Sequence, residues 1–297
     1  MSQASAPTIF DRRLLKLRLA RALRFGPANF LLEQVALDMG ERLGAVMRPF
    51  DRVLDLCSPA PDVAQMLTAR KPQLLVRAAP VPEALGEGDW LGLLADEEAL
   101  PFAPDSFDLI VSGLALQHVN DLPGALVQIR RALRPDGLFM ACIVGGQSLT
   151  ELRAALAAAE EEILEGVSPR VAPFVDLRDL GGLLQRAGFA LPVTDVDTVT
   201  VRYDHLFALA HDLRAMGATN ALTLRDKRGL RRTVLLRAAE IYAERFSDAD
   251  GRVRATFDLV WLCGWAPHES QQKPLQPGSA KMRLADALKT SERKLDD

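Results

Sequence analysis

Several side chains able to do chemistry stand at the ends of short apolar runs of the sequence. Three such runs cover residues 52–56, 91–95 and 107–112, and each is typical of a buried strand. The candidate side chains at or just after their ends are Asp55, Cys57, Asp96, Glu97, Gln117 and His118. Carboxylates and an amide can hydrogen-bond a ligand, and a histidine can act as a general base. Because parallel strands end at one edge of a sheet, the spacing predicts a ligand site there.

The elements that must position these side chains alternate between apolar runs and helical patterns. Runs typical of strands cover residues 52–56, 73–76, 91–95, 107–112, 138–144, 193–203 and 255–265. Helical patterns cover residues 62–70, 121–133, 148–165, 176–187 and most of 204–246, with a break near Gly217 and Asn220. The alternation predicts an α/β fold, a Rossmann-like three-layer sandwich with a mostly parallel seven-stranded sheet. Residues 80–88 are rich in proline and glycine, so we expect a short helix or a loop after the second strand.

The composition suggests a division of the chain into parts. We expect a helical segment over 1–49, the α/β domain over 50–273 with a helical insertion at about 204–246, and a polar tail over 274–297. Residues 11–24 hold six basic residues and one acidic residue. They predict a helix that packs Leu14, Leu17 and Ala20 onto the domain and leaves its arginines in solvent. A membrane-surface helix, with peripheral membrane contact, or an organelle-targeting segment are the alternatives.

The bulk composition argues against some classes of protein. Acidic residues exceed basic ones by 39 to 36, which gives a net charge of −3 and no sign of bulk nucleic-acid binding. The three cysteines are far apart and match no metal-ligand spacing, so we expect no metal site and a reducing compartment. No apolar run approaches the ~20 residues that a membrane-spanning helix needs.

The centre of the chain is similar to a known group of enzymes. Residues 94–122 read LADEEALPFAPDSFDLIVSGLALQHVNDL, in which an acidic pair precedes LPF and the strand FDLIVS follows. This stretch resembles the S-adenosylmethionine (SAM)-dependent methyltransferases of the biotin-synthesis type. The resemblance implies the class I methyltransferase fold and SAM as cofactor. The positions it assigns to cofactor binding are Asp55, Cys57, Asp96, Glu97 and Gln117, with the acidic pair at the adenine amine.

His118 is the candidate catalytic residue. It stands just after the 107–112 run, where the resembled enzymes usually carry a His-Trp pair that faces the substrate. The resemblance therefore implies a general base. A histidine in the wall of the pocket, partly buried and without a chemical role, is the alternative.

Further motifs along the chain resemble a narrower family. They are IFDR at 9–12, GGQSLTELR at 145–153, SPRVAPF at 168–174, DLGGLLQRAGF at 179–189, MGATN at 216–220 and GWAPHESQ at 264–271, followed by PGSA at 277–280. Together they are similar to assembly factors of respiratory complex I (NADH:ubiquinone oxidoreductase), known as arginine hydroxylases on a methyltransferase fold. The resemblance implies an iron–sulfur subunit of the complex as partner and, for a bacterial member, a cytoplasmic location.

The first loop departs from the methyltransferase pattern. That pattern has D-x-G-x-G-x-G, and here residues 55–61 read DLCSPAP, without a glycine. Glycine is needed because the turn uses backbone angles that side chains disfavour and because the cofactor lies against bare backbone. Moreover, Ala79 stands where an acid should bind the ribose hydroxyls, and the nearest carboxylate is Glu83.

Weakened or absent SAM binding is the resulting expectation. Two lost polar anchors would cost ~2–6 kcal/mol, or about one to four orders of magnitude in affinity. Two alternatives stay open for the function. One is an active SAM-dependent methyltransferase acting on a small molecule or a carrier protein, and the other is a non-catalytic assembly scaffold.

Other side chains predict structure rather than chemistry. His205 and His211 are six residues apart, which does not place them on one helix face as metal ligands. Trp261 and Trp265 share one face of a regular strand and are expected in the core. Arg170 is expected in solvent. His268 and Glu269 of PHESQ predict a structural or partner-recognition element.

Overall fold

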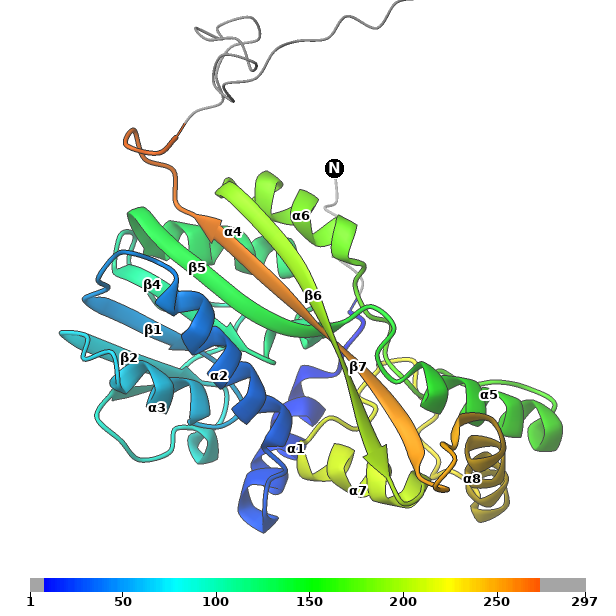
Figure 1. Ribbon diagram of the computed structural model, residues 1–297. Helices are drawn as coiled ribbons and strands as arrows, with labels where there is room; N and C mark the ends of the chain where they lie inside the picture. The colour runs from blue at the N-terminus through cyan, green and yellow to red at the C-terminus, as the bar shows by residue number, and fades with distance from the viewer. Residues whose placement is uncertain (1–7, 273–297) are drawn as a thin grey trace, which may run out of the picture. The chain divides into compact units, whose positions relative to one another are not determined.

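The structure is a computed structural model, which describes residues 8–272 of the chain (Figure 1). Its described residues up to Pro267 form one compact unit, and a second unit begins at His268. The strands are β1 (Arg52–Leu56), β2 (Leu74–Ala79), β3 (Leu91–Leu94), β4 (Phe107–Gly113), β5 (Leu133–Gly145), β6 (Ala190–Tyr203) and β7 (Val253–Trp265). They form one seven-stranded sheet in the order β3-β2-β1-β4-β5-β7-β6. β7 alone runs in the direction opposite to the other six strands. The sheet is therefore mostly parallel, and the predicted fold class is confirmed.

Helices cover both faces of the sheet (Figure 1). They are α1 (Arg12–Phe25), α2 (Phe30–Gly44), α3 (Asp62–Thr68), α4 (Leu122–Ala132), α5 (Thr150–Leu164), α6 (Leu177–Arg186), α7 (Leu206–Ala215) and α8 (Arg232–Phe246), with the 3₁₀ turns η1 (Pro82–Ala84) and η2 (Leu116–His118). Apolar residues of α4 and α6 pack on one face of the sheet, and those of α2 and α3 pack on the other. Because they are covered on both faces, the central strands are mostly apolar, which is why they were recognisable.

The chain beyond β5 forms a helical subregion beside the sheet. Side chains of α5, α7 and α8 enclose a third apolar cluster with the long ends of β6 and β7, around the fully buried Tyr242. The insertion predicted over 204–246 holds two helices, α7 and α8. The residues between them, 216–231, are largely irregular, so the predicted break is a longer segment than expected. His205 caps α7 by accepting a hydrogen bond from Ala208 N at 3.1 Å.

The helix α1 packs with a different face from the one predicted. Leu17 is 60% exposed, so its expected burial is wrong. Leu19, Ala20 and Leu23 instead pack against a small cluster at the end of β2, of which Ala79 is part. As expected, η1 stands in place of a full second helix. No helix within residues 8–272 is long and apolar enough to cross a membrane. Peripheral membrane contact stays a prediction.

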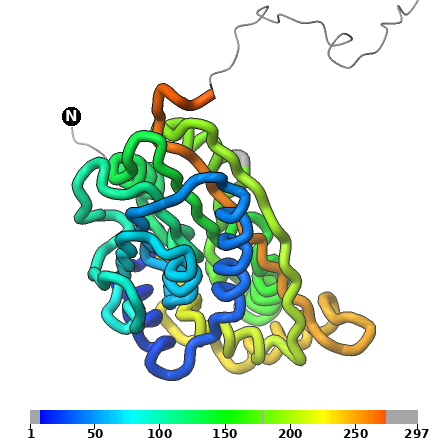
Figure 2. Tube along the Cα trace, turned by 60° about the vertical axis from the view of Figure 1, so that its left-hand side comes forward, coloured from blue at the N-terminus to red at the C-terminus, as the bar shows by residue number. Residues whose placement is uncertain are grey.

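A close backbone contact holds α1 beside the segment after α7. Both views show α1 next to α7 (Figures 1 and 2). Gly217 has φ +71°, and a Cβ placed there would lie 3.0 Å from Leu19 Cα and 3.1 Å from Leu19 N. A glycine is therefore required at this position both by the backbone conformation and by the neighbouring chain.

Gly217→Ala is expected to lower the free energy of unfolding by about 1–3 kcal/mol more than Gly26→Ala. Both glycines have positive φ, but a Cβ at Gly26 meets nothing within 4 Å, so only Gly217 adds a steric conflict with α1. Urea denaturation of the two variants measures the difference. Equal losses would show that α1 does not press against the segment after α7.

Candidate functional site

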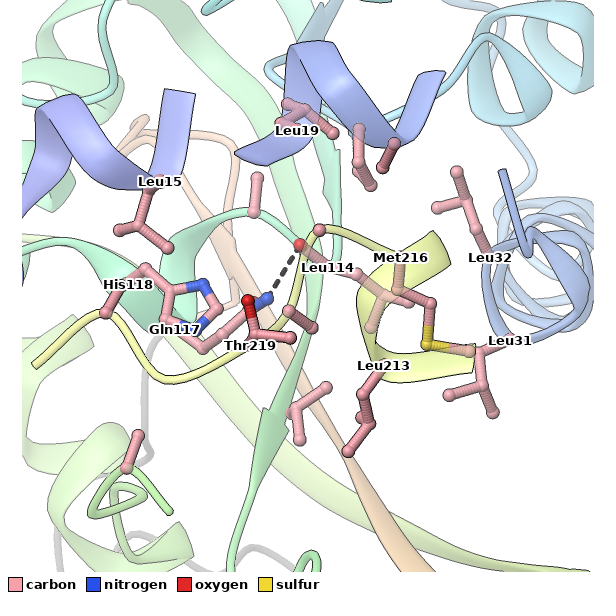
Figure 3. A pocket seen from close by; sticks show the side chains of 18 of the residues that line it. Leu15, Leu19, Leu31, Leu32, Leu114, Gln117, His118, Leu213, Met216 and Thr219 are labelled. Atoms are coloured by element: carbon pink, nitrogen blue, oxygen red, sulfur yellow. Dashed lines mark hydrogen bonds between the residues drawn. The ribbon is translucent and has the colours of Figure 1, made fainter. Parts of the chain in front are cut away.

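A cavity of about 200 Å³ lies at the carboxyl ends of the parallel strands, where the sequence places its candidate residues. Its floor is made by the loops that follow β1 to β5, and its roof by α1, the start of α2 and residues 213–221. Figure 3 shows Leu15 and Leu19 of α1 on one side and Leu213 and Met216 on another, with Gln117 between them. Most of the lining is apolar, so the few polar atoms that face it have little water around them.

The loop after β1 keeps the backbone conformation of a glycine loop but carries side chains. Cys57 has φ +57°, the left-handed region that costs an ordinary residue ~1–2 kcal/mol. Its side chain is 2% exposed and, with Pro59, lines the cavity. Burial, and then the negative charge of Glu97, raise the pKa of the Cys57 thiol well above its usual range. The thiol is therefore neutral, and it fills space that a glycine would leave open.

Asp55 is committed to a buried ion pair beneath this loop. Both Asp55 and Arg77 are fully buried, and their side chains are paired between neighbouring strands. Arg77 also donates to the carbonyl oxygens of Ser58 at 3.0 Å and of Ala84 at 2.6 Å, which fixes the loop against η1. Asp55 is not among the cavity-lining residues, and its assignment to cofactor binding stays a prediction. Reasoning from sequence missed Arg77; an arginine inside the apolar run LLVRAA was the one signal, and its register with Asp55 is visible only in the structure.

The position expected to bind ribose is covered by α1. Ala79 is fully buried, and Leu19 and Leu23 of α1 pack on the cluster that contains it. The nearest carboxylate along the chain, Glu83, forms an ion pair with Arg24 and is not among the residues that line the cavity. The cavity nevertheless extends to this end of the sheet, because Pro80, which follows Ala79, lines it together with Leu19 and Leu23.

The acidic pair after β3 holds a guanidinium from α1. Arg12 donates to Asp96 Oδ1 at 2.9 Å and forms a short contact with Glu97, while Lys16 Nζ lies 2.7 Å from Asp96 Oδ2. Glu97 is 4% exposed. Burial raises the pKa of Glu97 although Arg12 opposes it. For Asp96 burial is outweighed by Lys16 and Arg12, so its pKa is lowered. The expectation that the arginines of this helix are solvated is wrong for Arg12, whose side chain is 18% exposed.

Gln117 and His118 form the wall of the cavity after β4. Gln117 Nε2 donates to Leu114 O at 2.7 Å, whereas its buried Oε1 has no hydrogen-bond partner among the described residues (Figure 3). The His118 ring packs edge-on against Phe10, with ring centroids 5.3 Å apart. Burial, and then the charge of Arg12, lower the pKa of His118 to about 4. The imidazole is thus neutral near pH 7, and its role as a general base stays a prediction.

Motifs from distant parts of the sequence meet at the cavity. Arg18 donates to Thr219 O at 2.7 Å, and Asn220 Nδ2 donates to Pro169 O at 2.8 Å. Arg170 lines the cavity and donates to the fully buried Glu160 at 2.7 Å, so its expected solvent exposure is wrong. IFDR, SPRVAPF and MGATN therefore share one site, which neither composition nor periodicity could reveal.

Other sequence candidates lie in the core of the first unit or in the second unit. Trp261 and Trp265 both pack in the core cluster on the α2 and α3 face, as expected. In the second unit, His268 Nδ1 lies 2.7 Å from Ser270 Oγ, while PGSA lies outside the described residues. Within residues 8–272, no group of three or more His, Cys, Asp or Glu side chains is placed to hold a metal ion.

Comparison with known proteins decides the family. The pattern of the family described as "Methyltransferase domain" matches residues 42–141. The chain is 36% identical over 296 residues to the arginine-hydroxylase NDUFAF5 of Danio rerio, covering 97% of this chain and 92% of the relative. It is 38% identical to the human protein of that name, covering 94% and 83%. The chain belongs to the arginine-hydroxylase NDUFAF5 family.

Two further comparisons agree with the fold. The malonyl-[acyl-carrier protein] O-methyltransferase of Laribacter hongkongensis is 34% identical over 86% of this chain and 90% of its own. The structure of a candidate methyltransferase from Bacillus halodurans C-125 superposes with a TM-score of 0.55 at 15% identity, covering 78% of this chain and 99% of that one. The chain is therefore an NDUFAF5-family protein with the class I methyltransferase fold.

His118→Gln is expected to remove a pH dependence of stability. The folded state keeps His118 neutral down to about pH 4, whereas the unfolded chain takes up a proton near pH 6.5. Protonation therefore favours unfolding, and stability falls as the pH drops from 6.5 to 4, by about 3 kcal/mol at ~1.4 kcal/mol per pKa unit. Urea denaturation at pH 4 and 7 should show this extra loss in the wild type and in His211→Gln, but not in His118→Gln. The same loss in all three would contradict the assignment.

Arg77→Met is expected to cost about 3–5 kcal/mol, because it leaves the carboxylate of Asp55 buried without a cation. The double variant Asp55→Asn, Arg77→Met removes both charges and should be more stable than Arg77→Met alone. Urea denaturation of the two single variants, Asp55→Asn and Arg77→Met, and of the double variant gives the interaction free energy between the two side chains. Additive losses would mean that the two side chains act independently.

Proposed function

We propose that this chain is an assembly factor for respiratory complex I that engages an iron–sulfur subunit of the complex, with SAM binding weakened or lost. The observation that carries the proposal is the contrast within the cavity. Three of the motifs that resemble the NDUFAF5 family, IFDR, SPRVAPF and MGATN, converge on it, whereas the loop after β1 carries CSPAP and the ribose position lies beneath α1. Identity of 36–38% to arginine-hydroxylases NDUFAF5 over nearly the whole chain supports the same class of role.

The residues present do not fit SAM. The cavity, at about 200 Å³, is smaller than the ~300–1,000 Å³ of typical small-molecule pockets. Cys57 and Pro59 occupy the wall against which the methionine part would lie, and Pro59 has no N–H to offer. Arg12 and Lys16 already hold the acid that would meet the adenine amine. We therefore derive no reaction step through SAM.

What these residues support is recognition of a protein segment in a site from which water is largely excluded. The apolar lining from α1, α2 and α7 favours burial of apolar side chains. The carboxylate of Glu97 and the amide of Gln117 line the cavity and supply direction, because the buried Oε1 of Gln117 has no partner among the described residues. A cytoplasmic location belongs to this proposal.

Isothermal titration of the full chain with SAM, and with its demethylated product, tests the cofactor part. We expect no saturable binding by the wild type even at large ligand excess. The matched variant Cys57→Gly, Pro59→Gly, Pro61→Gly restores the bare loop and should gain affinity by at least about tenfold. Tight binding by the wild type would overturn this part of the proposal.

Deletion of the gene in its host tests the assembly part. We expect the level of assembled complex I to fall, because a partner subunit would lack its assembly factor, and to recover when the gene is supplied again. Native gel electrophoresis with an NADH oxidation assay measures both. An unchanged level of complex I in the deletion strain would count against the family role.

An active SAM-dependent methyltransferase is the second candidate. It is favoured by the retained Asp96–Glu97 pair and by the 34% identity to a malonyl-[acyl-carrier protein] O-methyltransferase. The isothermal titration with SAM decides between the methyltransferase and the assembly factor without SAM binding. A scaffold without chemistry is separated from a hydroxylase by mass spectrometry of the client subunit, which shows one added oxygen on an arginine only where hydroxylation occurs.

A further inference from the structure

The two edges of the sheet differ in how they are protected against pairing with another chain. The strand β6 forms one edge and carries the usual safeguards, which are Pro192 and the half-exposed carboxylates of Asp195 and Asp197. The strand β3 forms the other edge and reads LGLL, with neither a charge nor a proline among its residues. An apolar edge strand open to solvent is a template for the addition of a further strand.

The free side of β3 offers unpaired backbone groups. Ala95 N donates to Ala79 O at the end of β2 at 3.0 Å, and successive residues of a strand turn their N–H and C=O groups to alternate sides. Leu93 therefore faces β2, whereas Gly92 and Leu94 direct their groups away from it. Within residues 8–272, β2 is the one strand that pairs with β3. The edge thus presents the N–H and C=O groups of two residues to a further strand.

Exposed apolar side chains flank these backbone groups. Leu91 is 63% exposed and Leu94 is 53% exposed. They lie on opposite faces of the strand because an odd number of positions separates them. Four residues provide few backbone hydrogen bonds, so burial of these leucines must supply much of the binding free energy. A partner strand therefore needs apolar side chains as well as a free backbone.

The charge around β3 selects the chemistry of the partner. Glu87 and Asp89 precede the strand, are exposed, and form no ion pair within the described part of the chain. Residues 96–98, which read DEE, follow the strand, and Arg12 and Lys16 balance two of these three negative charges. The surroundings of the edge are therefore acidic. Lysine or arginine beside the apolar residues of a partner segment would complement them.

A second copy of this chain is a poorer match for the edge. Two copies related by a two-fold axis would pair their β3 strands antiparallel. Glu87 and Asp89 of one copy would then face residues 96–98 of the other. Like charges opposite one another destabilise a pair of strands. A partner with basic residues is therefore favoured over self-association.

We propose that the free edge of β3 binds an extended segment of a partner protein, which adds a further strand to the sheet. The segment places apolar residues beside the two exposed leucines and basic residues beside Glu87 and Asp89. Backbone hydrogen bonds to Gly92 and Leu94 set its register. None of residues 87–94 lines the cavity, so this docking edge is separate from the site at the carboxyl ends of the strands.

The test is binding of a blocked Lys-Val-Thr-Val-Thr-Val-Lys peptide to the full chain, measured by isothermal titration. We expect saturable binding, at least about tenfold tighter than that of the peptide with glutamate in place of both lysines, because only lysine complements the acidic flanks. The lysine peptide with every internal amide N-methylated keeps its charge but cannot pair as a strand. It should also bind at least about tenfold more weakly.

A matched pair of variants distinguishes the two edges of the sheet. Leu94→Lys adds a charge to the β3 edge and should weaken binding of the lysine peptide by at least about tenfold, because it repels the peptide and removes an apolar contact. Val196→Lys makes a similar change on the β6 edge, at a residue that is also exposed, and should leave binding unchanged.

Amide hydrogen exchange of the wild type, followed by nuclear magnetic resonance, locates the bound strand without any variant. The N–H groups of Gly92 and Leu94 should exchange more slowly when the lysine peptide is added, because both become hydrogen-bonded. The N–H of Leu93 already faces β2 and should change little.

Four results would overturn the inference. They are no binding of the lysine peptide, equal binding of the three peptides, equal loss of binding in Leu94→Lys and Val196→Lys, and unchanged exchange at Gly92 and Leu94. A wild-type dimer that Leu94→Lys dissociates, as measured by light scattering, would also overturn it, because a second copy would then be the occupant of the edge.

Discussion

The contact between Arg12 and the acidic pair at Asp96–Glu97 determines the form of the cavity. Removal of a guanidinium and a carboxylate from water costs several kcal/mol for each ion, and the loss is offset only where several partners converge. Here Asp96, Glu97 and the carbonyl of His118 converge on one guanidinium. Because Arg12 is fixed, the following turns of α1 lie over the end of β2. This contact, with the bonds of Arg18 to the segment after α7 and the packing of Leu19 and Leu23, places α1 over the cavity.

Most of the fold was predictable because its central strands are buried on both faces. Strands β1 and β4 are almost uniformly apolar, a pattern that only a sheet covered by two helical layers produces. The start of β5 was not predictable. Pro135 and Gly137 predict the end of a helix, but the chain pairs with β4 through this turn, beginning at Leu133. Pairing with a distant strand overrode the local signal.

The face of α1 could not be read from its sequence for a related reason. Leucine and arginine are interspersed along 12–25, and Leu17 lies on the side of the helix away from Leu19 and Leu23. Reasoning that sends every arginine to solvent selects Leu17 for the core, whereas the helix turns Arg12 inward and leaves Leu17 exposed. The side chains of Arg77 and Arg170 also turn inward instead of into solvent. Each pairs with a buried carboxylate on another element, Asp55 of β1 or Glu160 of α5, and such pairs form only when the chain has folded.

The charge of the acidic loop explains why it suits a guanidinium better than an adenine. An adenine amine is a neutral donor and needs a single acceptor, whereas Asp96 and Glu97 bring two carboxylates, one of them almost fully buried. In a methyltransferase the remaining cost is shared with contacts to the ribose and to the amino-acid tail. Here Arg12 and Lys16 of α1 supply the opposite charge. A guanidinium carries the opposite charge and five N–H donors in one plane, enough to reach both acids at once. The guanidinium of Arg12 meets this requirement, so the acidic pair has a cation partner within the chain itself.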